Sequence, residues 1–110
     1  MIAVDASTLP ETLAAADGVV IVEFGAEWCP PCRLIEPVLA ELALRHPDVS
    51  VVEVDTDASP DLAQAFGVMS VPTLIFFAGG RPVRRLVGAR GLTALEDELA
   101  QVVADITVTA

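Results

Sequence analysis

The sequence predicts one α/β domain of three layers, in which helices cover both faces of a mixed β-sheet. Apolar, β-branched runs alternate with segments of helical periodicity, and this order indicates parallel strands joined by helical crossovers. Near the end, two further strands flank Gly79-Gly80, a turn typical of an antiparallel hairpin. The 110 residues are 54% hydrophobic, enough to bury a core. We therefore expect a single domain over residues 1–110, with four to five strands and about four helices.

The first helix and the first long strand follow from local patterns. The segment TLPE, residues 8–11, has the form of a capping box with proline in the first turn, so we predict a helix from there to about residue 17. Gly18 ends it. Residues 19–24 are apolar and β-branched apart from Glu23, as expected for a strand buried on both faces.

A longer helix is predicted over residues 31–46, because apolar side chains recur there at i, i+3, i+4 and i+7. Pro37 lies inside this helix, where it removes one backbone hydrogen bond and is expected to introduce a kink. Residues 49–55 follow as a second interior strand, and residues 2–4 offer a short first strand.

The second half of the chain is expected to hold a short helix, the hairpin and a closing helix. Residues 59–66 suit the short helix, and 74–78 with 82–88 suit the two hairpin strands. The segment TALE, residues 93–96, has the form of a second capping box and begins the closing helix. The tail, residues 106–110, is compatible with either a strand or a frayed end.

The charge of the chain restricts its partners. The formal net charge is −10, and the sequence contains no lysine, so binding to nucleic acid or to an anionic membrane surface is disfavoured. The N-terminus has no basic and apolar signal pattern, and no apolar run reaches the roughly 18 residues of a membrane span. We therefore expect a cytoplasmic, monomeric protein without a nucleic-acid or membrane partner.

The two cysteines of the sequence, Cys29 and Cys32, are separated only by two prolines at the start of the long helix. A disulfide across so short a loop would remove little entropy from the unfolded chain, so it is a poor structural staple. A zinc site needs four ligands, and the only histidine, His46, lies about 20 Å away at the other end of the helix. Redox chemistry is the preferred interpretation, although two chains sharing a metal or cluster remains possible.

The helix start distinguishes the two sulfurs. Its unpaired N–H groups and dipole favour a thiolate at Cys29, whose pKa is expected to fall from ~8.5 toward 7. Cys29 is then the exposed, attacking sulfur, and the more shielded Cys32 resolves the mixed disulfide.

The stretches AEWCPPCRLIEP, FGVMSVPTLIFFAGG and VGA together resemble the thioredoxin family over nearly the whole chain. The resemblance implies the thioredoxin fold and a protein dithiol-disulfide oxidoreductase that reduces protein disulfides through Cys29 and Cys32. It implies no cofactor and no metal, with disulfide-containing proteins and a thioredoxin reductase-like electron donor as partners. The alternative is a non-catalytic binding module, or a metal or iron-sulfur carrier that uses the cysteines as ligands.

The resemblance also implies roles for individual residues. Pro72 matches the cis-proline that faces the disulfide, and the backbone of Val71 would pair with an extended substrate segment. Glu23 occupies the place of the buried acid beneath the cysteines. An apolar substrate-binding surface around Cys29 would comprise Trp28, Pro31, Val71, Gly88 and Ala89.

Three positions beneath the cysteines depart from the family pattern. The buried acid is usually aspartate, and Glu23 is one methylene longer. Gly25 replaces a tryptophan, and Glu53 stands where a lysine often neighbours the acid. If both glutamates point inward, burial and mutual repulsion would raise the pKa of at least one of them.

Overall fold

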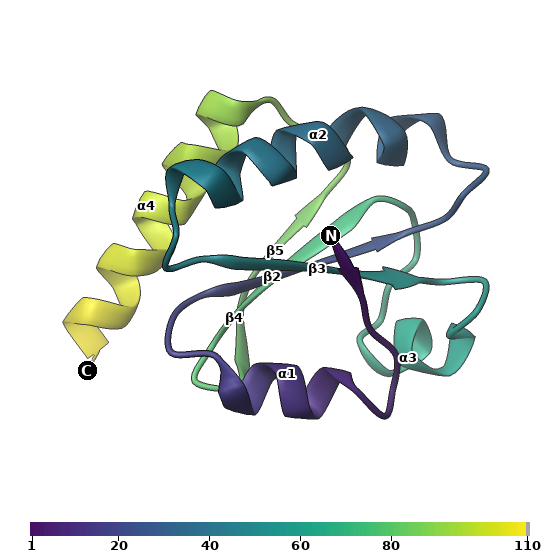
Figure 1. Ribbon diagram of the computed structural model, residues 1–110, viewed down its shortest axis with the longest axis horizontal. Coiled ribbons are helices and arrows are strands. Elements are labelled where there is room, and N and C mark those ends of the chain that lie inside the picture. Colours follow the sequence, from purple (N-terminus) through teal and green to yellow (C-terminus); the bar gives the residue numbers. More distant parts are fainter. Residues whose placement is uncertain (110) are drawn as a thin grey trace.

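The protein folds around a five-stranded mixed sheet (Figure 1). The structure, a computed structural model, describes residues 1–109. The strands follow the spatial order β1-β3-β2-β4-β5. β1, β3 and β2 are parallel, whereas β4 is antiparallel to both β2 and β5. The strand bounds are β1 Ile2–Ala3, β2 Val20–Gly25, β3 Ser50–Asp55, β4 Thr73–Ala78 and β5 Arg81–Val87.

Two layers of helices cover the sheet, so the three-layer mixed α/β fold class is confirmed (Figure 1). α2 and α4 lie on one face, and α1 and α3 lie on the other (Figure 1). The short strand predicted at the N-terminus and the antiparallel hairpin are both present. The helix bounds are α1 Leu9–Ala15, α2 Pro30–Arg45, α3 Pro60–Ala65 and α4 Leu92–Thr109.

The central strand β2 divides the core into two halves. Ile21 packs beneath α2 and α4, whereas Val22 and Phe24 pack on the side of α1 and α3. Successive side chains of a strand point to opposite faces, so the acid at position 23 belongs to the same face as Ile21. All six residues of β2 are buried. The prediction of a strand buried on both faces is therefore confirmed. The alternation of side chains along β2 places Glu23 on the face covered by α2.

Both predicted capping boxes are wrong. Thr8 does precede α1, but its hydroxyl accepts a hydrogen bond from the Asp5 amide and donates one to the Asp5 carboxylate, and makes no capping bond. The turn at Asp5 therefore competes successfully for that hydroxyl. Thr93 lies inside α4, because the helix begins one residue earlier and the amide of Leu95 donates to the carbonyl of Gly91.

The C-terminal tail is helical through residue 109, so the strand alternative is wrong; residue 110 lies outside the described part.

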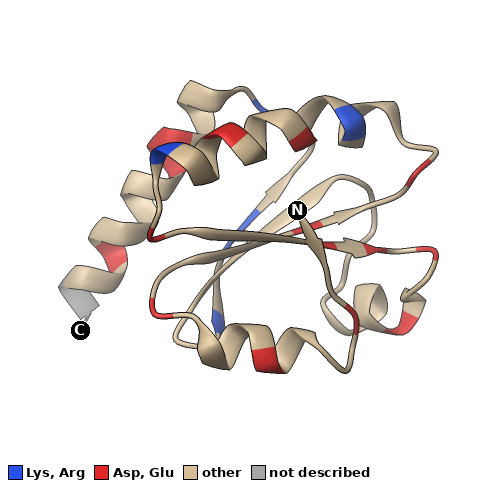
Figure 2. Ribbon diagram, in the orientation of Figure 1, with Lys and Arg blue, Asp and Glu red and all other residues tan. Residues whose placement is uncertain are grey.

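Charge is distributed unevenly over the elements, with acids on most of them and arginines on α2, the hairpin and the turn before α4 (Figure 2). Arg84 of β5 forms an ion pair with Glu98 of α4 at 2.8 Å, which links the edge strand to the last helix. Within residues 1–109, no helix is both long and apolar enough to cross a membrane.

Candidate active site

The cysteine pair lies at the N-terminus of α2, which begins directly behind the end of β2. Cys29 is the residue that caps the helix, and it is disulfide-bonded to Cys32 with a Cα–Cα distance of 5.3 Å. The first two helical positions are Pro30 and Pro31. Proline suits these positions, because their N–H groups would have no partner within the helix and the ring fixes a helical φ. The segment therefore holds the two sulfurs at bonding distance without a long side-chain reach.

One backbone amide donates a hydrogen bond to the Cys29 sulfur. The amide of Cys32 donates a hydrogen bond to the Cys29 Sγ at 3.2 Å. The two intervening prolines have no N–H, so this amide is the first one that the helix can offer. In the reduced protein, the same donor and the helix dipole would favour the Cys29 thiolate over the thiol.

The expected difference in exposure between the cysteines is nearly absent. In the disulfide form Cys29 is 2% and Cys32 is 1% exposed. Both sulfurs pack with Ala26, and Val71 covers them from the neighbouring loop. Solvent exposure in the disulfide form therefore does not distinguish the two sulfurs, which differ in their places at the helix start.

The loop that faces the disulfide contains the cis peptide bond between Val71 and Pro72. Pro72 is buried, and its carbonyl accepts a hydrogen bond from the amide of Gly88 at 2.8 Å, which ties the loop to the end of β5. Within the described chain, the amide and carbonyl of Val71 form no hydrogen bond with another residue. These groups are therefore free to pair with an incoming extended chain.

The surface around the cysteines is apolar. Trp28 is 66% exposed, Pro31 and Ala89 are exposed, and Gly88 is half-buried. The structure adds Met69, 95% exposed and two residues before the cis-proline loop, which the sequence analysis missed. An apolar residue so close to the VPT segment is the signal that could have identified it.

The indole of Trp28 is held in place by a residue that the sequence analysis also missed. Its Nε1 donates a hydrogen bond at 2.8 Å to the carboxylate of Asp57, in the turn between β3 and α3. The two residues are separated by 29 positions, so no local sequence pattern connects them.

Glu23 lies beneath the cysteines and is 1% exposed. Its Oε2 atom has no hydrogen-bond partner. Burial, followed by the charges of Glu36 and Glu53, raises the pKa of Glu23 to about 7. A Cβ atom added to Gly25 would collide with Glu23 Oε2 and would lie 3.4 Å from the Cys32 Sγ. The carboxyl group and the sulfur therefore border the same small space.

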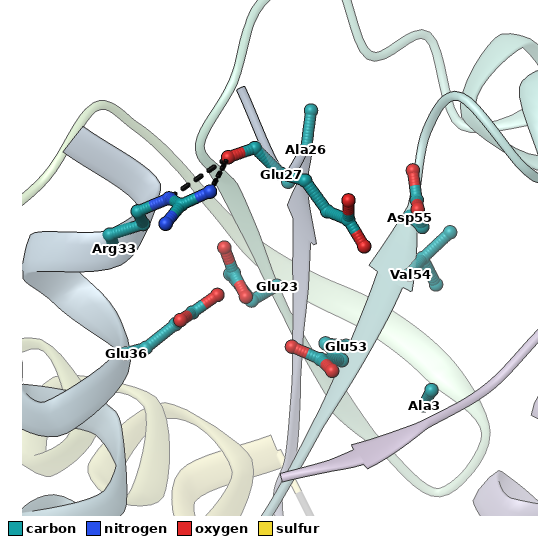
Figure 3. Close-up of a pocket in the computed structure, with 10 residues that line it drawn as sticks. Ala3, Glu23, Ala26, Glu27, Arg33, Glu36, Glu53, Val54 and Asp55 are labelled. Carbon is teal, nitrogen blue, oxygen red and sulfur yellow. Dashed lines mark hydrogen bonds between the residues drawn. The ribbon is translucent and has the colours of Figure 1, made fainter. Parts of the chain in front are cut away.

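Two further acids surround Glu23. Glu53 is its register partner on the adjacent parallel strand β3, so both side chains project on the same face. Glu36 reaches the group from α2, and the three carboxyl groups converge on a cavity of about 360 Å³ (Figure 3). Sequence analysis predicted the Glu23–Glu53 proximity and missed Glu36. Its position one helical turn after Cys32 was the available signal.

Comparison with known proteins agrees with this geometry. The sequence model of the thioredoxin family, described as "Thioredoxin", matches residues 1–101. A thioredoxin from Mycobacterium bovis is 45% identical over 103 residues, which cover 93% of this chain and 88% of the relative. A bifunctional thioredoxin reductase/thioredoxin from Mycobacterium leprae is 42% identical over 103 residues, covering 93% of this chain and 22% of that protein.

Solved structures show the same likeness. The structure of a mutant thioredoxin from Halobacterium salinarum superposes with a TM-score of 0.85 at 37% identity, covering 92% of this chain and 88% of that one. The two cysteines form a disulfide, and the chain is similar to thioredoxins over most of its length. Neither observation favours the alternative of a binding module or a cysteine-ligated metal carrier. The chain belongs to the thioredoxin family and is a dithiol-disulfide oxidoreductase.

Proposed function

We propose that this oxidoreductase reduces disulfides in other proteins, with Cys29 as the attacking thiolate and Cys32 as the resolving thiol. The observation that carries this assignment is the hydrogen bond from the Cys32 amide to the Cys29 Sγ at the start of α2. A donor at that atom stabilises negative charge on Cys29 and not on Cys32.

The reaction proceeds in two exchanges. The Cys29 thiolate attacks one sulfur of the substrate disulfide, forms a mixed disulfide and releases the other substrate sulfur as a thiolate. Cys32 then loses its proton and attacks the Cys29 sulfur, which forms the Cys29–Cys32 disulfide and releases the second substrate thiolate. Two electrons have passed to the substrate, and the protein is left oxidised.

Glu23 is the group placed to take the proton from Cys32. Its carboxyl lies beside the Cys32 sulfur and is buried without a hydrogen-bond partner of its own. A base in this position raises the thiolate fraction of Cys32 at the step that needs it.

The substrate binds in an extended form across the cis-proline loop. The free backbone groups of Val71 supply the pairing, and the proline that follows fixes the loop at the disulfide. The surrounding surface of Trp28, Pro31, Gly88 and Ala89 contributes apolar contacts.

A thioredoxin reductase-like donor returns the pair to the dithiol. The Mycobacterium leprae relative is a bifunctional thioredoxin reductase/thioredoxin, and this supports such a partner. Thioredoxins need no cofactor of their own, so the cysteine pair itself carries the electrons. The protein acts as a monomer. A reducing compartment such as the cytoplasm suits a chain whose only two cysteines form this pair.

An insulin-reduction assay with dithiothreitol as electron donor tests the assignment of the two sulfurs. Cys29→Ser should abolish turnover. Cys32→Ser, reduced and then freed of dithiothreitol before insulin is added, should accumulate a mixed disulfide through Cys29, visible by mass spectrometry. Glu41→Gln on the exposed side of α2 is the matched control. Turnover retained by Cys29→Ser, or substrate trapped on Cys32 in that variant, would overturn the assignment.

A further inference from the structure

Three glutamates beneath the disulfide form a cluster that the thiol chemistry does not explain. Glu23, Glu36 and Glu53 each place one carboxylate oxygen within 4.8 Å of the others. They come from β2, α2 and β3, so three separate elements hold them together (Figure 3). Only Glu23 borders the Cys32 sulfur, which leaves two acids without a part in the exchange.

In the part of the chain that the structure describes, the glutamates of the cluster form no ion pair. Arg33 lines the same cavity, but its guanidinium group donates to the carbonyl of Glu27 through both Nε and an Nη atom (Figure 3). Arg33 therefore brings positive charge to the cavity but forms no ion pair with any of the three carboxylates.

The most buried member of the cluster also lacks a partner. Glu23 is 1% exposed, its Oε2 has no hydrogen-bond donor, and its side chain lines the cavity. Buried polar atoms are nearly always satisfied, so an orphaned carboxylate in a side chain that lies among two other carboxylates indicates that an exogenous group completes the site. Glu36 and Glu53 are half-buried and leave the cavity accessible.

We propose that Glu23, Glu36 and Glu53 bind a divalent cation of the calcium class. Carboxylate oxygens are the ligands of hard cations. Ca²⁺ binds oxygen at about 2.3–2.6 Å, so ligands on opposite sides of the ion lie about 5 Å apart. The three carboxylate oxygens lie within 4.8 Å of one another, so an ion of this size can contact all three. Mg²⁺, with bonds of about 2.0–2.1 Å, demands a stricter octahedral shell and should bind more weakly.

The cavity supplies the remaining requirements of the site. Three carboxylates give fewer oxygens than the six to eight ligands that Ca²⁺ takes. The space of about 360 Å³ accommodates the waters that would complete the shell. Gly25 keeps this arrangement possible, because a side chain there would displace the Glu23 carboxylate.

Isothermal titration calorimetry with Ca²⁺ and Mg²⁺ as probes tests the site. The full chain is first stripped of metal with a chelator and is then kept at about pH 8. We expect one saturable Ca²⁺ per chain and weaker binding of Mg²⁺. Glu36→Gln and Glu53→Gln should each lower the Ca²⁺ affinity by at least roughly tenfold. Glu41→Gln, an exposed acid on α2, should leave it unchanged.

The melting temperature supplies a second measurement. Ca²⁺ should raise it in the parent protein and not in the Glu36→Gln/Glu53→Gln double variant, because a ligand that binds only the folded state stabilises it. Circular dichroism checks that the double variant is folded. Absence of binding at millimolar Ca²⁺, or equal binding by the double variant and Glu41→Gln, overturns the proposal. The cysteine variants that test the proposed function are assayed with chelator present, so failure of the cation site and failure of the proposed function are distinguishable.

Discussion

Glu23 and Gly25 occupy one space beside the Cys32 sulfur, and the carboxylate fits there only because residue 25 has no side chain. A Cβ atom at Gly25 would collide with Glu23 Oε2, and the same point lies 3.4 Å from the Cys32 Sγ. The family pattern has a shorter acid and a large aromatic residue at these two positions. The longer acid and the glycine are therefore mutually dependent in this chain.

This dependence predicts non-additive stability. Gly25→Ala should destabilise the protein by about 1–3 kcal/mol, because it overpacks a buried site. Glu23→Asp withdraws the carboxylate, so the double variant should lose less free energy of unfolding than the two single variants together. Urea denaturation of the four proteins in the cycle measures this coupling, and strictly additive losses would show that the two residues act independently.

The free energy of unfolding should depend on pH through Glu23. Its pKa is raised to about 7 in the folded protein, above the ordinary value of 4.5 for a glutamate. Between these values the folded state holds a proton that the unfolded state has lost. Stability therefore falls as pH rises from about 4.5 to about 7 and then levels off, by about 3 kcal/mol in total.

Urea denaturation between about pH 5 and pH 8, with chelator present, measures this slope. Glu23→Gln should remove most of the decline, because the amide does not ionise. Glu41→Gln should keep the decline of the parent protein. A parent protein that gains stability over this range would contradict the raised pKa of Glu23.

The proton transfer from Cys32 gives a kinetic prediction. Glu23→Gln should slow the resolution of the mixed disulfide while the initial attack by Cys29 proceeds normally. Stopped-flow measurement of the two phases separates these steps. The resolving phase should also lose its dependence on a group of pKa near 7, whereas a role in packing alone would leave that pH profile intact.

The hydrogen bond between Trp28 and Asp57 predicts an effect on substrate binding. Asp57→Ala removes the hydrogen bond that holds the indole of Trp28. Because this side chain is 66% exposed, few packing contacts then fix its orientation. The KM for a protein disulfide should rise roughly two- to tenfold, the equivalent of about 0.5–1.5 kcal/mol, with little change in kcat. Asp61→Ala, an exposed acid in the first turn of α3, is the control. A fall in kcat at constant KM would instead place Asp57 in the chemical step.

Local sequence patterns predicted the elements because each depends on its own side chains. Strand burial at residues 19–24, the helix after the cysteines and the glycine turn were all correct within one or two residues. The predictions of capping boxes were wrong because the partner of a Thr hydroxyl depends on which groups the folded chain brings close to it. At Thr8 that partner is the amide of Asp5.

The sequence by itself determined the chemistry of the cysteine pair, since Cys29, Cys32 and the intervening prolines are neighbours in the chain and the helix start is encoded there. It also indicated Glu23 and Glu53, through a resemblance at single positions. Only the tertiary structure decided that Glu36 joins them, because α2 must pack on the face of β2 and β3 before a residue on the helix can approach the two strand acids. No sequence pattern predicts a cation site there, since close approach of carboxylates from three elements is a property of packing and not of spacing along the chain.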